Sequence, residues 1–260
     1  NATNDRSPAR MVGVANVMHG FSMPPNGKLG GKNSTVIFAD CDFDRTVDEA
    51  VRSSFANQGQ VCLCGSRILV ERSLYDRFVE AFAHRVSALK VGDPADPETH
   101  LGSLVSAAHR DKVEGYIALA ETEGGTIATG GVRPVLTGPL AGGAFLRPTV
   151  VTGLAHTSRT ATEEIFGPLV TVHAFDTEDE AIQMANGVKY GLAASVWTNN
   201  LGRAHRVAGA LETGMVWVNT WLKRDLRVPF GGVKASGVGR EGGKYSLSFY
   251  TQDKNICIQL

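Results

Sequence analysis

Short apolar runs alternate with segments of helical periodicity along most of this chain of 260 residues. The run 34–40, STVIFAD, is rich in β-branched residues and predicts a buried strand, and the run 66–72 predicts another. The segments 42–55 and 73–92 carry apolar residues at helical spacing. Further strands are expected at 126–131, 145–151, 169–175, 192–198 and 214–219, and further helices at about 106–122, 177–186 and 200–211. Apolar strands that alternate with helices predict an α/β domain with a mostly parallel open sheet and flanking helices.

The two ends of the chain differ from this pattern. Residues 1–26 contain many turn-forming residues without a sustained period, which predicts an irregular tail. The stretch SFYTQDKNICIQL at 248–260 alternates weakly and predicts a terminal strand. A terminal strand without a partner in its own chain is typical of an oligomer edge, so we expect a homo-oligomer. The helix over 73–92 is expected to end at Gly92, shortly before Pro94.

The composition argues against several classes of partner. The formal net charge is zero, which favours neither nucleic acid nor an anionic membrane surface. No apolar run approaches the ~18–20 residues of a membrane span, and the first residues lack the pattern of a secretory signal. The cysteines, Cys41, Cys62, Cys64 and Cys257, are too few and too unevenly placed for a disulfide framework. We therefore expect a cytoplasmic protein that acts on a small molecule.

The stretch FANQGQVCLCGSR at 55–67 places two cysteines close together after a polar turn, and three interpretations are open. A metal site needs further Cys or His ligands, and the nearest histidine, His84, lies within a predicted helix. Small apolar filler is the usual role of a free cysteine. In the third interpretation, the turn places Cys62 where backbone N–H groups point at its sulfur. Such placement lowers the thiol pKa from about 8.5 and favours a nucleophilic thiolate.

Three stretches together resemble the motifs of one enzyme family. The stretch 55–67 resembles the nucleophile signature of the aldehyde dehydrogenases, F-x-N-x-G-Q-x-C. EEIFGP at 163–168 resembles their cofactor-contacting motif, and PFGGVKASGVGREGG at 229–243 resembles their C-terminal signature. Taken singly, the second could be a helix end stopped by Gly-Pro, and the third a flexible glycine loop. It is not a Walker A motif, because Lys234 is not followed by Ser or Thr. Their occurrence in the family's order favours the resemblance.

The resemblance extends over residues 27–260 and implies a domain plan. WLKRDLRVPFGG and the ending SLSFYTQDKNICIQL are most similar to the 2-hydroxymuconic and 2-aminomuconic semialdehyde dehydrogenases. The implied plan is an irregular tail of unclear origin at 1–26, a catalytic domain at 27–243, and an oligomerisation strand at 244–260. It also implies that the chain carries the C-terminal catalytic half, with the Rossmann-like NAD-binding domain largely absent.

The resemblance implies specific roles for four residues. Cys62 would be the catalytic cysteine, and Cys64 would occupy a supporting position. Glu164 would hold the nicotinamide ribose and Phe166 would pack beside the nicotinamide ring of NAD, or of NADP. The implied reaction is attack of the Cys62 thiolate on an aldehyde, loss of hydride to the cofactor, and hydrolysis of the resulting thioester.

The substrate class implied by the closer likeness carries carboxylates. A guanidinium binds a carboxylate through two hydrogen bonds, so Arg224 and Arg227, in KRDLR, are the candidates. They could equally belong to a solvated surface loop. Asn219, which precedes this segment, is expected to help line the pocket.

One position departs from the family pattern in a way that affects the chemistry. The family reads L-E-L-G-G-K, and its Glu is the general base for deacylation. This chain reads GKLGGK at 27–32, so Lys28 occupies the base position. An ammonium accepts no proton unless its pKa falls far below about 10.4. The expected function is NAD(P)-dependent oxidation of an aldehyde, a muconic semialdehyde, in which acylation survives and deacylation fails. The alternative is a non-catalytic, oligomer-forming fragment or pseudoenzyme of the same family.

Overall fold

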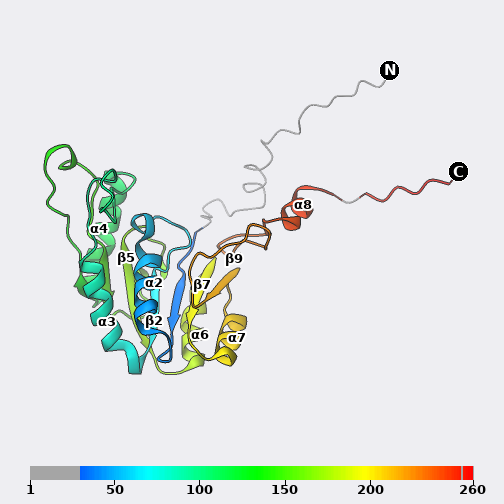
Figure 1. Ribbon diagram of the computed structural model, residues 1–260, viewed down its shortest axis with the longest axis horizontal. Coiled ribbons are helices and arrows are strands. Elements are labelled where there is room, and N and C mark those ends of the chain that lie inside the picture. The colour runs from blue at the N-terminus through cyan, green and yellow to red at the C-terminus, as the bar shows by residue number, and fades with distance from the viewer. Residues whose placement is uncertain (1–29, 253, 260) are drawn as a thin grey trace, which may run out of the picture.

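A computed structural model of this chain describes residues 30–252 and 254–259 (Figure 1). The tail predicted at 1–26 and Lys28 lie outside the described residues.

The main sheet has seven strands in the order β3-β4-β5-β2-β1-β7-β8. Its strands are β1 Ser34–Ile37, β2 Arg67–Glu71, β3 Thr126–Thr129, β4 Thr149–Thr152, β5 Leu169–Phe175, β7 Ala193–Trp197 and β8 Met215–Val218. All neighbouring strands are parallel except β3, which is antiparallel to β4. A small antiparallel sheet pairs β6 Tyr190–Gly191 with β9 Val233–Lys234. The predicted α/β class with a mostly parallel sheet is confirmed.

Helices cover both faces of the sheet (Figure 1). The α-helices are α2 Phe43–Phe55, α3 Arg72–Ser87, α4 Ala107–Thr122, α5 Arg159–Thr162, α6 Glu178–Asn186, α7 Leu201–Ala210 and α8 Lys244–Tyr250, of which α8 lies away from the sheet (Figure 1). Neighbouring residues of β1 point into different cores. Ile37 packs with Phe78 of α3, whereas Val36 packs with Met184 of α6 and Val207 of α7. The sheet is therefore buried on both faces, which explains why its strands are continuous apolar runs.

Two predicted boundaries differ from the observed ones. Helix α3 ends at Ser87 rather than at Gly92. The residues after it leave the helix to pair with a later segment, since Lys90 O accepts from His100 N at 2.9 Å and Gly92 N donates to Leu101 O at 3.0 Å. Strand β4 begins after Pro148 rather than at residue 145. Proline has no N–H to contribute to a strand ladder.

The C-terminal region also differs from its prediction. Residues 244–250 form helix α8, not a strand. Gly242 and Gly243, with φ of 105° and 47°, turn the chain into this helix. The Ser248 and Thr251 hydroxyls then donate to carbonyl oxygens four residues earlier, which supports a helical turn. Residues 251–252 and 254–259 form no strand within the described part of the chain, and their pairing with another chain stays a prediction.

Three segments meet at one edge of the main sheet. Residues 30–33 precede β1, residues 62–66 precede β2, and residues 163–168 precede β5. These strands are parallel neighbours, so their amino ends lie at the same edge. The motifs around Cys62 and Glu164 are therefore brought together by the strand order.

Candidate active site

The turn before Cys62 has an unusual backbone. Asn57, Gln58 and Gly59 have φ of 48°, 57° and 70°, so three consecutive residues adopt the left-handed conformation. Asparagine and glycine tolerate this conformation better than most residues. A Cβ on Gly59 would also lie 2.3 Å from Gly167 O. The turn therefore needs glycine at 59 and packs directly against the segment that carries Glu164.

Buried side chains fix the backbone around Cys62. Asn33 Nδ2 donates to Cys62 O at 2.8 Å and to Cys64 O at 2.9 Å. Trp221 Nε1 donates to Leu63 O at 3.0 Å. Three consecutive carbonyl oxygens are thus held from inside the protein, and Cys62 itself is exposed. Sequence reasoning missed Asn33 and Trp221, because neither lies in a motif that signals a contact with a distant carbonyl.

The electrostatic environment of Cys62 corrects one prediction. The backbone N–H groups of Cys62 and Leu63 do lower the pKa of the thiol, as expected, and the charge of Arg224 acts in the same direction. Partial burial is the larger effect and raises this pKa above 9.0, and the Glu164 carboxylate adds to the rise. Although its surface reaches solvent, the surroundings of Cys62 therefore disfavour the thiolate rather than favour it.

Cys64 has a different environment from Cys62. Its side chain is buried, and its Sγ lies 3.7 Å from Ala56 O. Burial raises the pKa of this thiol to about 12, so it is an inert thiol. The apolar-filler interpretation therefore fits Cys64 and not Cys62. Within residues 30–252 and 254–259, no group of three or more His, Cys, Asp or Glu side chains is placed to hold a metal ion.

Glu164 and Phe166 lie beside Cys62. All three residues line one small cavity, together with Gly31 and Gly59. Gly31 N donates to Glu164 Oε1 at 2.9 Å. A Cβ on the neighbouring Gly30 would lie 2.1 Å from Glu164 Oε2, so only glycine leaves room for this carboxylate. Phe166 has φ of 63° and is 39% exposed, which leaves its ring accessible next to the thiol.

Helix α4 holds the segment 163–166 through one of its faces. The donors are Lys112 Nζ to Ile165 O at 3.0 Å and Tyr116 Oη to Glu163 Oε2 at 2.6 Å, and His109 Nε2 lies 2.6 Å from Phe166 O. Residues spaced by three and four share a helix face, so α4 reaches four consecutive residues of the segment. Only the helix itself, and not this contact, was predictable from periodicity.

A larger cavity opens on the other side of Cys62. Its volume is about 250 Å³, and Leu192, Phe230 and Tyr250 give it an apolar lining. Residues 231–232 and 236–241 of the glycine-rich segment complete the wall. This segment is not a free loop, because β9 pairs with β6 and Phe230 pairs with Glu241. The buried Ser236 hydroxyl donates to Gly30 O and accepts from Gly191 N.

The three predicted substrate residues lie in different surroundings. Arg224 stacks on Phe230, with its Cζ 4.2 Å from the ring centroid, and its charge acts on Cys62. Arg227 is bound through two nitrogens to Asp225, and its side chain is 86% exposed. Asn219 uses its side chain on the backbone of Thr198, accepting from N at 3.0 Å and donating to O at 2.9 Å. None of the three lines the two cavities beside Cys62. Arg224 lines a neighbouring cavity, which shares Phe230 and Glu241 with the larger of the two.

Comparison with known proteins gives a consistent result. The sequence model of the aldehyde dehydrogenase family matches residues 21–256. A 2-hydroxymuconic semialdehyde dehydrogenase of Pseudomonas putida is 53% identical over 233 residues, which is 90% of this chain and 48% of that protein. The human 2-aminomuconic semialdehyde dehydrogenase is 49% identical over 234 residues, 89% of this chain and 48% of that protein. The chain thus spans about half the length of the curated relatives it matches.

Solved structures show the same fold. A betaine aldehyde dehydrogenase from Staphylococcus aureus, in complex with NAD+, superposes with a TM-score of 0.82 at 46% sequence identity. The match covers 85% of this chain and 44% of that one. The sheet, the cysteine turn and the matched family model lead to one conclusion: this chain belongs to the aldehyde dehydrogenase family.

Proposed function

We propose that this chain oxidises an aldehyde to a carboxylate, with Cys62 as the nucleophile. The observation that carries the proposal is the position of Cys62 between two cavities. One cavity has Glu164 and Phe166 in its wall, and the other is larger and mainly apolar. A reactive thiol between a polar and an apolar cavity suits a reaction that joins a cofactor and an organic substrate.

NAD or NADP is the proposed cofactor, and when bound it supplies the hydride acceptor. The described residues fit its nicotinamide end. Gly30 leaves space that Glu164 fills, so this carboxylate is placed to accept hydrogen bonds from ribose hydroxyls. The exposed ring of Phe166 provides an apolar surface for the nicotinamide. The family membership supports the same assignment.

The chain's own residues carry the covalent steps. The Cys62 thiol gives its proton to solvent, and Sγ forms a bond to the aldehyde carbon while the C=O π bond breaks, to give a thiohemiacetal with its negative charge on oxygen. The backbone N–H groups of Cys62 and Leu63 lower the pKa of the thiol, and in the proposal they also stabilise the charge that develops on oxygen. Loss of hydride leaves a thioester on Cys62. Its hydrolysis requires a base, and Lys28 stands where the family has glutamate.

We propose a muconic semialdehyde as the substrate, with Arg224 binding its carboxylate. The charge of Arg224 acts at Cys62, and the Pseudomonas and human relatives are named for such substrates. Arg227 is the weaker of the two candidates, because Asp225 already occupies its guanidinium. A homo-oligomer formed through residues beyond 250 remains part of the proposal. No helix in the described part of the chain is long and apolar enough to cross a membrane.

The test is NADH formation by the purified chain with NAD+ and 2-hydroxymuconic semialdehyde. We expect about one NADH per chain in a rapid burst, followed by slow turnover, because an ammonium at position 28 cannot activate the deacylating water. Cys62→Ala should abolish the burst. Lys28→Glu should raise the steady-state rate by about a hundredfold or more, the usual contribution of a positioned general base.

The matched control is Cys64→Ala, which removes a thiol two residues away without touching the reacting sulfur. A burst that persists in Cys62→Ala would sink the proposal. Absence of any burst in a folded, native chain would favour the non-catalytic alternative.

A further inference from the structure

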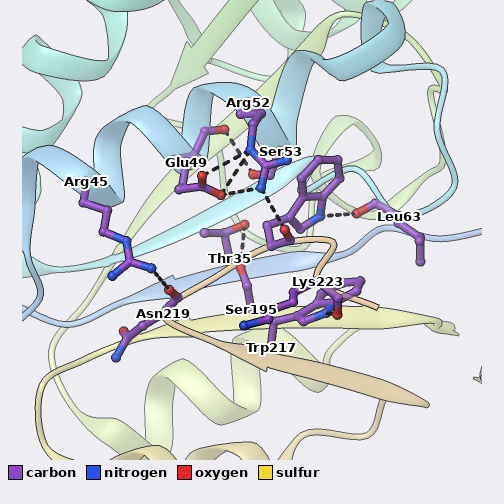
Figure 2. A network of polar contacts seen from close by, with 12 residues as sticks. Thr35, Arg45, Glu49, Arg52, Ser53, Leu63, Ser195, Trp217, Asn219 and Lys223 are labelled. Carbon is purple, nitrogen blue, oxygen red and sulfur yellow. Dashed lines mark hydrogen bonds and ion pairs between the residues drawn. The ribbon is translucent and has the colours of Figure 1, made fainter. Parts of the chain in front are cut away.

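The segment 219–223 lies along helix α2 and is held by side chains at every second carbonyl (Figure 2). The pairs are Arg45 Nη2 with Asn219 O at 2.9 Å, Arg52 Nη2 with Trp221 O at 2.8 Å, and Trp217 Nε1 with Lys223 O at 3.0 Å. Arg45 and Arg52 are seven residues apart, so they project from the same side of α2. Helix α2 therefore fixes both the start and the middle of this segment.

The backbone of this segment adopts costly conformations. Asn219 and Leu222 have φ of 52° and 59°, in the left-handed region. A residue other than glycine seldom adopts this conformation unless its surroundings hold it there. Leu222 is also partly exposed and has little packing to hold it. The side-chain donors therefore determine a conformation that the segment would not adopt alone.

Trp221 connects this segment to the nucleophile. Its indole N–H donates to the carbonyl oxygen of Leu63, the residue after Cys62, and its side chain is only 3% exposed. Its ring packs in an apolar cluster with Leu63 and Trp217. On its other side lies the guanidinium of Arg52, with Cζ 4.9 Å from the ring centroid.

Arg52 is itself held in place. Its guanidinium binds the carboxylate of Glu49 on the same helix, with the shortest distance 2.6 Å. A planar guanidinium bound at both a carboxylate and a carbonyl has little freedom to rotate. Glu49, Arg52, Trp221 and Leu63 thus form a continuous chain of contacts from α2 to the cysteine turn.

Three residues after Trp221, Arg224 brings a positive charge to Cys62. Arg224 stacks on Phe230 and makes the Cys62 thiolate more favourable, whereas Glu164 makes it less so. Arg240 and Glu241 are the charged residues in the wall of the larger cavity, and Arg224 lines a neighbouring cavity that shares Phe230 and Glu241 with it. Of these four groups, only Arg224 belongs to a segment anchored on the cysteine turn itself.

We propose that Trp221, supported by Arg52, is a positioning residue that sets the separation between the Arg224 guanidinium and the Cys62 sulfur. The proposal rests on the roles assigned above to Cys62 and Arg224, and it adds how their geometry is fixed. Because one residue holds both loops, a shift of the substrate-binding arginine moves the nucleophile with it. The distance between a bound carboxylate and the reacting carbon is thereby set.

The test uses a readout that needs neither cofactor nor aldehyde. The rate of Cys62 alkylation by iodoacetamide is measured across pH, with the modified residue identified by tandem mass spectrometry of the 53–67 peptide. Trp221→Phe keeps the aromatic packing and removes the N–H that binds Leu63 O. We expect its titration midpoint to rise, and its rate at pH 7 to fall about two- to threefold, because only the thiolate reacts.

A double-substitution cycle separates positioning from a general structural effect. Arg224→Met alone should raise the midpoint, because it removes a favourable charge. In the Arg224→Met background, Trp221→Phe should then add no further shift. Two shifts that simply add would overturn the proposal, because Trp221 would be acting independently of Arg224.

A surface variant tests the proposal if Trp221→Phe folds poorly. Arg52 is 48% exposed, so Arg52→Met should fold while it frees Trp221 O and the ring face. Its midpoint should shift in the same direction. Arg133→Met is the matched control. Arg133 is 54% exposed, and two of its nitrogens bind the carboxylate of Glu114, which lies on helix α4 and not on α2. An unchanged pH profile in both Trp221→Phe and Arg52→Met would refute the positioning role.

These outcomes are distinguishable from those of the proposed function. If the pH profile of Cys62 alkylation shifts in the variants but the chain oxidises no aldehyde, the positioning role of Trp221 stands and the proposed function is wrong. If the chain oxidises the aldehyde in a Cys62-dependent way but the pH profile of alkylation does not shift in the variants, the proposed function stands and the positioning role is wrong.

Discussion

His173 shows what burial does to a single ionisable residue in this protein. It lies in β5, it is 5% exposed, and its ring nitrogens contact Leu154 O at 3.2 Å and Thr171 Oγ1 at 2.9 Å. Burial lowers the pKa of His173 from 6.5 to about 4, with the charge of Arg67 adding to the effect. The folded protein therefore keeps this imidazole neutral over a range in which the unfolded chain protonates it.

This difference predicts an acid-sensitive stability. Between pH 6.5 and about 4 the unfolded state binds more protons than the folded state at His173, so stability falls as the pH falls through this window. The full decrease in the free energy of unfolding that comes from His173 is on the order of 3 kcal/mol. Urea unfolding at pH 7 and pH 4.5 measures it. His173→Gln, which does not titrate, should lose distinctly less stability between the two pH values, and an equal loss in both proteins would contradict the assignment.

The residues of the candidate site also show what a sequence can and cannot predict. Cys62, Glu164 and Phe166 were found through motifs, and the fold brings them to one cavity. The sign of the Cys62 pKa shift was not found, because it depends on how much protein surrounds the sulfur. Asn33 and Trp221 were missed, since a side chain that binds a carbonyl 29 or 158 residues away leaves no local pattern.

Among the elements, helix α4 is the one whose function depends most on tertiary contact. The sequence predicts only a helix at about 106–122, and the structure shows that its polar residues bind the segment 163–166. Tyr116 donates to Glu163, which Arg159 also binds through two nitrogens. These donors hold the pKa of Glu163 down to about 2. The carboxylate is therefore a permanently charged anchor between α4 and α5.

Removing one of these donors should loosen the segment locally. We expect Tyr116→Phe to speed backbone hydrogen exchange at 163–168 by about fivefold, which corresponds to the ~1 kcal/mol of a typical hydrogen bond. Tyr75→Phe is the control, because the Tyr75 hydroxyl donates to Val172 O, in the middle of β5. Exchange at 163–168 that is unchanged in Tyr116→Phe would show that α4 does not hold the segment.

Element boundaries were predictable where a local signal decides them. The bounds of β5 and α6 agree with their predicted ranges to within a residue. The end of α3 was misplaced, because the pairing of Val91 with Leu101 outweighs the helical pattern. The predicted strand at the C-terminus was wrong for residues 244–250, where weak alternation was less informative than the glycine pair that precedes the helix.

For the whole molecule, the contacts that complete the site all span long stretches of sequence. Ser236 reaches Gly30 across 206 residues, Asn33 reaches Ala193 across 160, and Lys32 reaches Thr160 across 128. Strand β1 is paired on one side with β7, so even the sheet that carries the site is closed by a distant segment. Parallel pairing of this kind is slow to form, because the intervening chain must first be ordered.

The order of folding follows from this arrangement. The helix before Cys62 and the strand after it can pair early, but Leu63 O acquires its donor only when Trp221, after β8, arrives. Asn33, which binds the carbonyls of Cys62 and Cys64, is itself fixed by Ala193 N of β7. We expect that during refolding from urea the Cys62 thiol is alkylated at the unfolded rate until the last kinetic phase. Pulse labelling with iodoacetamide would measure this, and early protection of Cys62 would contradict it. The proposed nucleophile therefore acquires its environment last, as a property of the completed chain rather than of the motif that contains it.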